Sequence, residues 1–161
     1  MKVFEEPYNS LVELIELKNN LLSGKDNYEL SGCIEPIKPS IINGLSHNKT
    51  LVIARDDVRA RELSNKYNGY SDDGVMFPAK DVMFYQADIR GNALTKERIA
   101  ALKSILGEEK TTIFVSVDAL INCMPSKELF SYNSLRIKVG DTIDLISYEK
   151  MLVSLGYDKE E

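Results

Sequence analysis

Apolar positions along the chain recur at two spacings, which together predict an alternation of helices and strands. Helical spacing marks residues 10–22, 40–45, 57–67 and 95–106. Short apolar runs typical of strands lie at 28–31, 50–54, 74–77 and 111–117. A strand that is apolar on both faces, as at 50–54, is typical of a parallel sheet covered by helices on both sides. The pattern therefore predicts an α/β fold, a three-layer sandwich with a mostly parallel sheet.

Polar residues at the ends of these segments indicate where helices begin. Asp56 and Asp57 follow the strand at 50–54, and capping of the next helix is favoured over metal or ribose binding. Thr95 is expected to open the long helix that ends at Gly107. Asp118 is expected to cap a short helix through Cys123. Its alternative role, a magnesium-binding Walker B aspartate, is disfavoured because Ala119 takes the place of a second acid.

The pattern changes in the last part of the chain. Residues 135–139 alternate strictly between apolar and polar side chains, which predicts a half-exposed strand rather than a buried parallel one. A turn at 140–144 then leads into a final helix, whose apolar face holds Tyr148, Met151, Leu152 and Leu155. The organisation of the chain therefore changes near residue 135, although a length of 161 residues by itself favours one domain, with at most a small appendage.

Composition and charge limit the classes of function. The chain has 161 residues, of which 43% are hydrophobic and 28% charged, as in ordinary globular domains. Its net charge of −5 disfavours a dedicated nucleic-acid binder, because that affinity depends on cations that contact phosphates. A local DNA-binding patch is an alternative, and its cations would lie on two helices. These are Arg55, Arg59, Arg61 and Lys66 on the first and Lys96, Arg98 and Lys103 on the second. Glu62 and Glu97 interrupt both groups, which favours solvated helix faces.

Other residue types indicate location and metal content. No apolar run approaches the roughly 20 residues that span a bilayer, and no signal-peptide core follows the first residues, so a cytoplasmic protein without membrane contact is expected. Cys33 and Cys123 are far apart in the sequence and are expected to be buried, reduced thiols. With His47 as the only histidine, no metal site is expected.

The segment from Gly32 to Ser40 resembles a phosphate-binding loop that has lost its chemistry. Gly32 and Lys38 keep the spacing of G-x-x-x-x-G-K-[ST], but Ile37 replaces the second glycine and Pro39 replaces the hydroxyl residue. Pro36 and Pro39 remove backbone N–H donors, and Glu35 places a negative charge where phosphate would bind. A loop that opens a helix is the favoured interpretation. The alternative is an atypical nucleotide site with Lys38 on the phosphates and Ser40 on magnesium.

Several short motifs occur in an order that resembles a known family. After an initial helix and the degenerate loop come the sequences LVIAR at 51–55, FPAKD at 77–81, VSV at 115–117, KVGD at 138–141 and LGY at 155–157. Tyr85, Arg98, Leu102 and Leu120 belong to the same series. This order resembles the N-terminal region of bacterial transcription-repair coupling factors, which is similar to the excision-repair subunit UvrB.

The resemblance implies a RecA-like domain, of the P-loop NTPase type, that has lost its ATP site. Residues 1–133 would be the UvrB-like domain, and 134–161 would be the truncated start of a second domain that binds UvrA. Neither catalytic residues nor cofactors are expected here, because ATP and magnesium would act in motor domains further along the full-length DNA translocase. The expected role is a non-enzymatic scaffold for UvrA recruitment and for restraint between domains in nucleotide excision repair. RNA polymerase and DNA would be contacted only through the full-length protein. Phe84 and Tyr85 are possible interaction residues, with burial against the sheet as an equal alternative.

Overall fold

The computed structural model of the chain describes residues 11–24, 27–80, 88–134, 137–155 and 157, with side chains from residue 93 onward in the helix that begins at Asp88. Contacts divide the chain into two compact units, Met1–Cys123 and Met124–Glu161. The predicted identities of domains 1–133 and 134–161 stay a prediction. None of the described helices is both long and apolar enough to cross a membrane.

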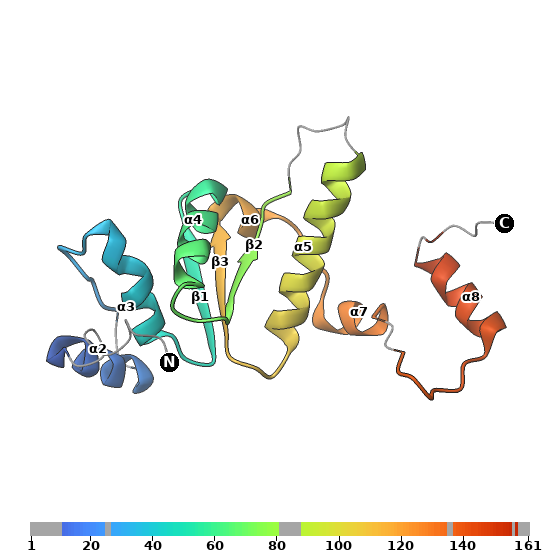
Figure 1. Cartoon of the computed structure of the whole chain (residues 1–161), viewed down its shortest axis with the longest axis horizontal. Coiled ribbons are helices and arrows are strands. Elements are labelled where there is room, and N and C mark those ends of the chain that lie inside the picture. Colours follow the sequence, from blue (N-terminus) through green and yellow to red (C-terminus); the bar gives the residue numbers. More distant parts are fainter. Residues whose placement is uncertain (1–10, 25–26, 81–87, 135–136, 156, 158–161) are drawn as a thin grey trace. The chain divides into compact units, whose positions relative to one another are not determined.

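The first unit contains the sheet (Figure 1). Its elements are α2 (Val12–Leu22), η1 (Glu35–Ile37), α3 (Lys38–Leu45), β1 (Lys49–Ala54), α4 (Asp57–Tyr67), β2 (Gly74–Phe77), α5 (Asp88–Leu106), β3 (Thr111–Ser116) and α6 (Val117–Ile121). Among the described residues the strands form one sheet in the order β1-β3-β2, and both pairings are parallel. The predicted α/β class with a parallel sheet is therefore confirmed. The more specific assignment to a RecA-like sandwich stays a prediction.

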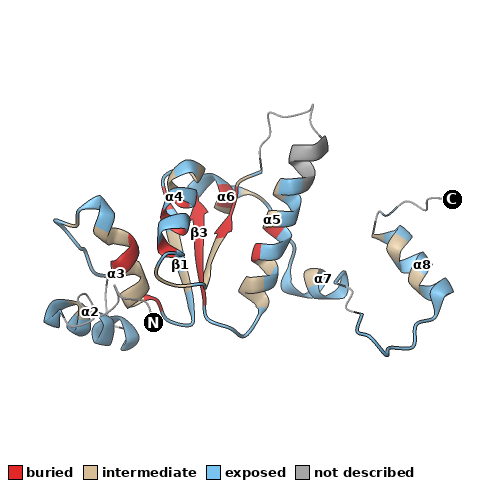
Figure 2. Cartoon of the chain, viewed as in Figure 1, coloured by how far each residue is buried: buried red, intermediate tan, exposed pale blue. Residues whose placement is uncertain are grey.

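The central strand β3 is buried at every position, because it has a strand on each side and a helix layer on each face (Figure 2). Its β-branched and aromatic residues fit a pleated surface packed on both sides. In the register, Leu51 lies opposite Ile113 and Ile53 opposite Val115. Leu51 and Ile53 are about half exposed, at 52% and 56%, so β1 is covered less completely than β3.

Two apolar clusters fill the two faces of the sheet. On one face, α4 packs against the strands through Ala54, Ala60, Leu63, Tyr67, Met76 and Phe114. The rings of Tyr67 and Phe114 meet with centroids 5.2 Å apart and planes tilted by 58°. On the other face, α5 and α6 contribute to a cluster of Phe77, Ala101, Ile113, Val115 and Ala119. Helix α4 thus lies on one side of the sheet and α5 on the other.

One lysine side chain joins the beginning of β1 to the end of α5. Lys49 Nζ donates hydrogen bonds to the carbonyl oxygens of Ser104 at 2.8 Å and Glu109 at 2.6 Å, and to Thr111 Oγ1 at 2.9 Å. The last carbonyls of a helix have no partner within the helix, and a cation satisfies them well. The side chain of Lys49 therefore holds the α5–β3 turn against the first strand.

Most of the predicted elements of the first unit are confirmed. The strand at 74–77 has the predicted bounds, and β1 and β3 differ from the prediction by one residue at one end. Asp56 caps α4 as expected, because its side chain accepts a hydrogen bond from the backbone N–H of Arg59 at 2.7 Å. Local signals sufficed for these short apolar runs and for a cap that directly follows a strand.

Four predictions are wrong in detail. Residues 28–31 form no strand, because no described strand edge pairs with them and an extended segment alone is not stable. Helix α5 begins at Asp88, so Thr95 lies inside it. Helix α6 begins one residue before Asp118, and its cap is Ser116, whose hydroxyl accepts from the Ala119 N–H at 3.1 Å. In the described part of the last predicted strand, Ile137 to Val139, the backbone is irregular.

The second unit contains two described helices, α7 (Lys127–Tyr132) and α8 (Leu145–Ser154). Neither helix has a buried residue, and Figure 2 shows α8 mostly in the exposed colour. The predicted final helix is confirmed, with Asp144 as its cap and Ile146 N–H as the donor at 3.2 Å. The apolar side chains of α8 include Leu145 and Ile146, which are 77% and 66% exposed.

Candidate functional site

The predicted phosphate loop leads into two successive helical turns. Gly32 has a φ of +74°, a left-handed conformation that favours glycine. After it, η1 spans Glu35–Ile37 and α3 begins at Lys38, with Pro39 in its first turn. The interpretation of this segment as a loop that opens a helix is confirmed. Whether it descends from a nucleotide site stays a prediction.

Of the two side chains proposed for a nucleotide, Lys38 is paired with an acid and Ser40 is buried. The ammonium group of Lys38 forms an ion pair with the carboxylate of Glu35, three residues earlier. Ser40 is buried, with 5% of its surface exposed, so its hydroxyl is not accessible to a magnesium ion bound from solvent. The atypical nucleotide site would therefore require both residues to change their surroundings.

Glu35 also forms an ion pair with Arg59, which lies on α4. Arg59 Nη1 in turn donates to Glu62 Oε2 at 2.8 Å, and Lys66 Nζ donates to Glu62 Oε1 at 2.5 Å. The hydrogen bonds from Lys66 and Arg59 hold the pKa of Glu62 below its ordinary value. Charges of alternating sign thus run from α3 along the outer face of α4.

A hollow of about 540 Å³ opens beside this chain of charges, at the carboxyl end of β1. Besides Glu35 and Glu62, it is lined by Lys38, Ile53, Ala54, Arg55, Arg59 and Leu63. The carboxyl ends of parallel strands are the usual place for ligands in open α/β sheets. This hollow is therefore the candidate site of the first unit.

Asp57 has a role that the sequence pattern did not indicate. Its Oδ2 accepts a hydrogen bond from the backbone N–H of Ala79 at 2.8 Å, and its Oδ1 accepts one from the hydroxyl of Ser116. Ser116 is also the cap of α6. One carboxylate thus joins the start of α4 to the segment that follows β2 and to the last residue of β3. The adjacent acids had been interpreted together as caps, and only Asp56 has that role.

Arg98 is a buried structural cation rather than a free one. Only 8% of its surface is exposed, its guanidinium lies 4.1 Å from the centroid of the Phe77 ring, and its Nη1 donates to the carbonyl oxygen of Pro78. Burial lowers the pKa of Arg98, while the nearby charge of Asp57 acts in the opposite direction. The cation–π contact and the hydrogen bond fix α5 against the end of β2.

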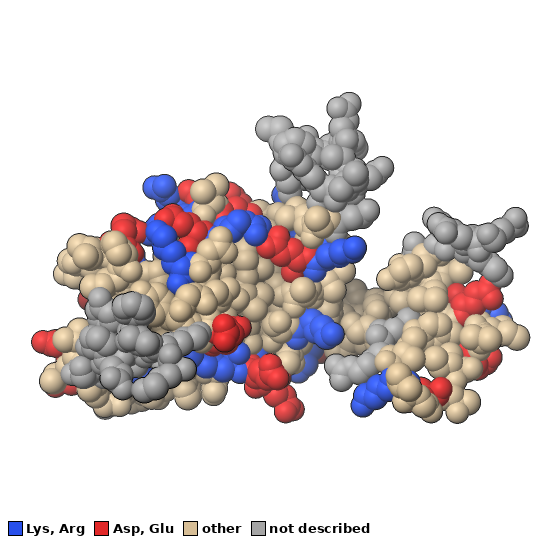
Figure 3. Space-filling model, viewed as in Figure 1, with Lys and Arg blue, Asp and Glu red and all other residues tan. Residues whose placement is uncertain are grey.

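The other basic residues that could have formed a DNA patch mostly have acidic partners. Arg61 contacts Glu97 through two hydrogen bonds, of 2.7 and 3.1 Å, which raise the pKa of Arg61. Arg55 pairs with Asp56 at 2.9 Å. Figure 3 shows Lys and Arg side chains interspersed with Asp and Glu on the visible face. Of the acids that interrupt the basic groups in the sequence, Glu62 pairs with Arg59 and Lys66, and Glu97 pairs with Arg61.

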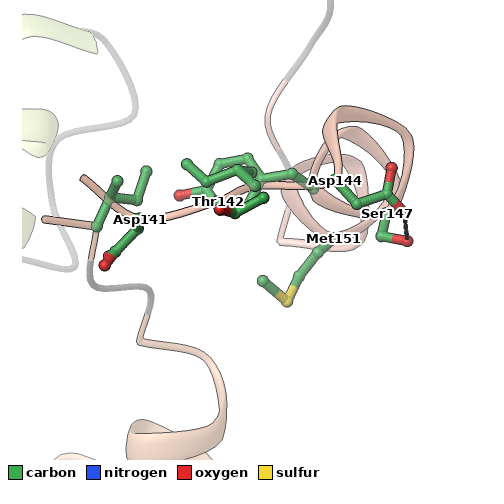
Figure 4. A pocket seen from close by; sticks show the side chains of 8 residues that line it. Asp141, Thr142, Asp144, Ser147 and Met151 are labelled. Atoms are coloured by element: carbon green, nitrogen blue, oxygen red, sulfur yellow. Dashed lines mark hydrogen bonds between the residues drawn. The ribbon is translucent and has the colours of Figure 1, made fainter. Parts of the chain in front are cut away.

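The second unit has a hollow of its own, of about 480 Å³, beside the first turn of α8. In Figure 4 the side chains of Asp144 and Ser147 point toward each other, and their hydrogen bond measures 2.6 Å. That bond lowers the pKa of Asp144. Asp141 Oδ2 accepts from the backbone N–H of Lys138 at 2.8 Å. These acids therefore serve the turn and the helix cap.

Within the described ranges, no three His, Cys, Asp or Glu side chains come close enough together to hold a metal ion. Cys33 and Cys123 are free thiols, and Cys123 is exposed rather than buried. The possible interaction residues Phe84 and Tyr85 lie outside the described residues.

Several known proteins are similar to this chain. It is 23% identical over 142 residues to a transcription-repair-coupling factor from Staphylococcus epidermidis, a match that covers 85% of this chain and 12% of that protein. It is 30% identical over 148 residues to a UvrABC system protein B from Thermosipho africanus, covering 86% and 22%. A UvrABC system protein B from Fervidobacterium nodosum is 26% identical over 147 residues, also covering 86% and 22%. No family model matches the chain, and no solved structure matches it significantly.

These matches confirm the resemblance inferred from the order of the sequence motifs. Over most of its length, the chain is similar both to transcription-repair-coupling factors and to UvrABC system protein B. The chain spans between 12% and 22% of the length of these three relatives. The similarity therefore concerns one region of much longer repair proteins.

Proposed function

We propose that this chain is the UvrB-like region of a transcription-repair coupling factor, and that it acts as a non-catalytic interaction module supporting the recruitment of UvrA. The observation that carries the proposal is the similarity to both kinds of repair protein over about 85% of the chain. A region shared by two such proteins is suited to a step that both require. Engagement of the damage sensor UvrA is the step implied by the resemblance.

The ion pairs at the candidate site support a role without nucleotide chemistry. The carboxylate of Glu35 pairs with Lys38, the cation that a phosphate loop would direct at its ligand. In this proposal ATP and magnesium act only in the motor domains of the full-length protein. RNA polymerase and DNA are likewise contacted through the full-length protein, in which this region would help to restrain the other domains.

The exposed apolar residues of α8 support an interaction role for the second unit. Leu145, Ile146 and Val153 are 77%, 66% and 55% exposed. Apolar side chains gathered on one exposed helix mark a surface that another protein or domain can cover. Within the proposal, α8 forms part of the surface on which UvrA binds.

Capture of purified UvrA from the same organism tests this role. We expect the natural full-length protein to capture UvrA, and Ile146→Glu in that protein to weaken the capture at least fivefold. The matched control is Val58→Glu, because Val58 is also a β-branched apolar residue, 81% exposed, on α4 in the first unit. Equal capture by the unmodified protein and both variants would contradict a role for α8. Absence of any capture by the unmodified protein would contradict the proposed recruitment.

Titration with nucleotide tests the non-catalytic part of the proposal. We expect no heat of binding and no thermal shift when this chain is mixed with millimolar ATP and magnesium. A specific micromolar site that Lys38→Ala abolishes would instead support the alternative, a nucleotide-binding regulatory domain with an atypical phosphate loop.

A further inference from the structure

The carboxylate of Glu35 contacts two cations from different helices. One oxygen, Oε1, pairs with Lys38 Nζ at the start of α3, and the other, Oε2, pairs with Arg59 Nη2 on α4. An acid that divides its two oxygens between two cations in this way has the same arrangement as a bound oxyanion. Lys38 and Arg59 therefore form a two-cation site that the chain's own carboxylate occupies.

The exposure of the three side chains indicates which of them can be replaced with the least disturbance of the other two. The side chain of Arg59 is 20% exposed, whereas those of Lys38 and Glu35 are 41% and 54% exposed. Arg59 is held in place from the other side by Glu62, at 2.8 Å. Glu35 is thus the outermost member, and its replacement leaves the position of Arg59 supported.

The charge of the hollow depends on Glu35. Its lining contains the basic residues Lys38, Arg55 and Arg59 and the acidic residues Glu35 and Glu62. Without the carboxylate of Glu35, two cations lose their contact with it and the hollow becomes clearly cationic. The lining also contains the apolar residues Ile53, Ala54 and Leu63, which lower the local dielectric and strengthen attraction to an anion.

We propose that this hollow is an anion site whose resident occupant is Glu35, and that it binds a small phosphate anion when that carboxylate is removed. The ligand class is a compact polyanion such as pyrophosphate, which can contact Lys38 and Arg59 together. Glu35 thereby acts as an internal competitor that keeps phosphate-bearing ligands out of the hollow. The inference concerns the first unit only, and it does not depend on UvrA recruitment.

The experiment is a titration of the chain with pyrophosphate at about 50 mM salt, followed by calorimetry and by thermal shift. We expect Glu35→Ala to bind pyrophosphate at least tenfold more tightly than the unmodified chain. Glu35→Gln keeps the size of the side chain and is expected to give a similar gain. The double variant Glu35→Ala, Lys38→Ala should lose that gain. Because exposed charges are screened, the gain should also shrink at about 500 mM salt.

Glu97→Gln is the matched control, because it removes one carboxylate from an arginine of the same helix, Arg61, outside the hollow. It should bind pyrophosphate no better than the unmodified chain. Circular dichroism establishes that each variant is folded. The proposal is overturned if both folded Glu35 variants bind no more tightly than the unmodified chain, or if Glu97→Gln gains as much affinity as they do.

Discussion

The phenol oxygen of Tyr67 lies 2.9 Å from the hydroxyl oxygen of Thr112, in a fully buried contact between α4 and the central strand β3. The same phenol donates to Asp73 Oδ1 at 3.0 Å, and the Thr112 hydroxyl also contacts Ser46 Oγ at 3.2 Å. Asp73 directly precedes β2, and Ser46 follows α3. One phenol group therefore links α4 to the beginnings of two strands.

Replacement of Tyr67 by Phe should destabilise the chain by about 1–3 kcal/mol, because buried polar partners lose a hydrogen bond while the ring packing on Phe114 is kept. Urea unfolding measures the change. Tyr132→Phe is the control, since Tyr132 is 84% exposed on α7, and it should leave the stability nearly unchanged. Equal effects of the two substitutions would show that the buried hydrogen bonds of Tyr67 contribute nothing to the free energy of unfolding.

Acid should weaken the contact between α4 and β2 through Asp73. Burial raises the pKa of this carboxyl, but hydrogen bonds from Ser71 and Tyr67 and the charge of Lys110 outweigh burial, so the folded-state pKa lies below the ordinary value. A lowered folded-state pKa contributes stability above the unfolded pKa of about 3.9, and that stability is lost as pH falls through the folded value.

The stability difference between the unmodified chain and Asp73→Asn should therefore be largest near neutral pH and shrink below about pH 4. Urea midpoints at pH 7 and pH 3 measure it. Lys110→Met removes one of the causes, since Lys110 Nζ lies 3.3 Å from Asp73 Oδ2, and it should reduce the pH dependence in part. A difference that is the same at both pH values would contradict this role.

Substitution of Gly74 by Ala should be poorly tolerated. A Cβ at this position would lie 2.2 Å from Asn68 Oδ1 and 2.7 Å from Tyr67 Cδ1. Asn68 could move only by giving up its 3.1 Å hydrogen bond to the Gly74 carbonyl, and the Tyr67 ring is fixed in the core. We expect a loss of about 1–3 kcal/mol in unfolding free energy.

Gly107→Ala is the matched control for this substitution, because its Cβ would lie at an ordinary 3.5 Å from its nearest neighbours, the carbonyl oxygens of Lys103 and Ser104. Thermal unfolding of both variants compares them. A Gly74→Ala chain as stable as Gly107→Ala would mean that the start of β2 can shift freely.

Asp57 and Asp56 should respond differently to the same substitution. Asp57→Asn keeps a single acceptor oxygen for two donors, the Ala79 N–H and the Ser116 hydroxyl, and should cost about 1–3 kcal/mol. Asp56→Asn should cost little, since asparagine is as good a helix cap as aspartate. Chemical denaturation of the two variants gives the comparison. If Asp56→Asn lost more stability than Asp57→Asn, the proposed role of the Asp57 carboxylate in joining α4 to Ala79 and Ser116 would be wrong.

The elements that could be predicted from sequence are those whose signal is local. A fully apolar run such as β3 and an acid directly before a helix, such as Asp56, need no knowledge of distant residues. The segment at 28–31 has similar local chemistry, but a strand forms only where another strand edge accepts its hydrogen bonds. The choice between Ser116 and Asp118 as a cap depended on where β3 ends, a boundary that sequence patterns locate poorly.

At the candidate site, too, contacts between neighbours in the sequence could be predicted and contacts between distant residues could not. The negative charge of Glu35 beside Lys38 was visible in the sequence, because the two residues are three apart. The contact of Glu35 with Arg59, and that of Asp57 with Ser116, join residues from separate elements. Such pairs depend on how α3, α4 and β3 pack together, and a single sequence carries no direct signal for them.

The strand order β1-β3-β2 has a consequence for how the first unit folds during synthesis. In the described sheet, β1 and β2 do not pair with each other, and every strand pairing uses residues Thr111–Ser116. A nascent chain that ends before Thr111 therefore has two strands with no partner in this sheet. Parallel pairing between distant segments is also slow. We expect the sheet to assemble in one late step, after which the core closes on both faces.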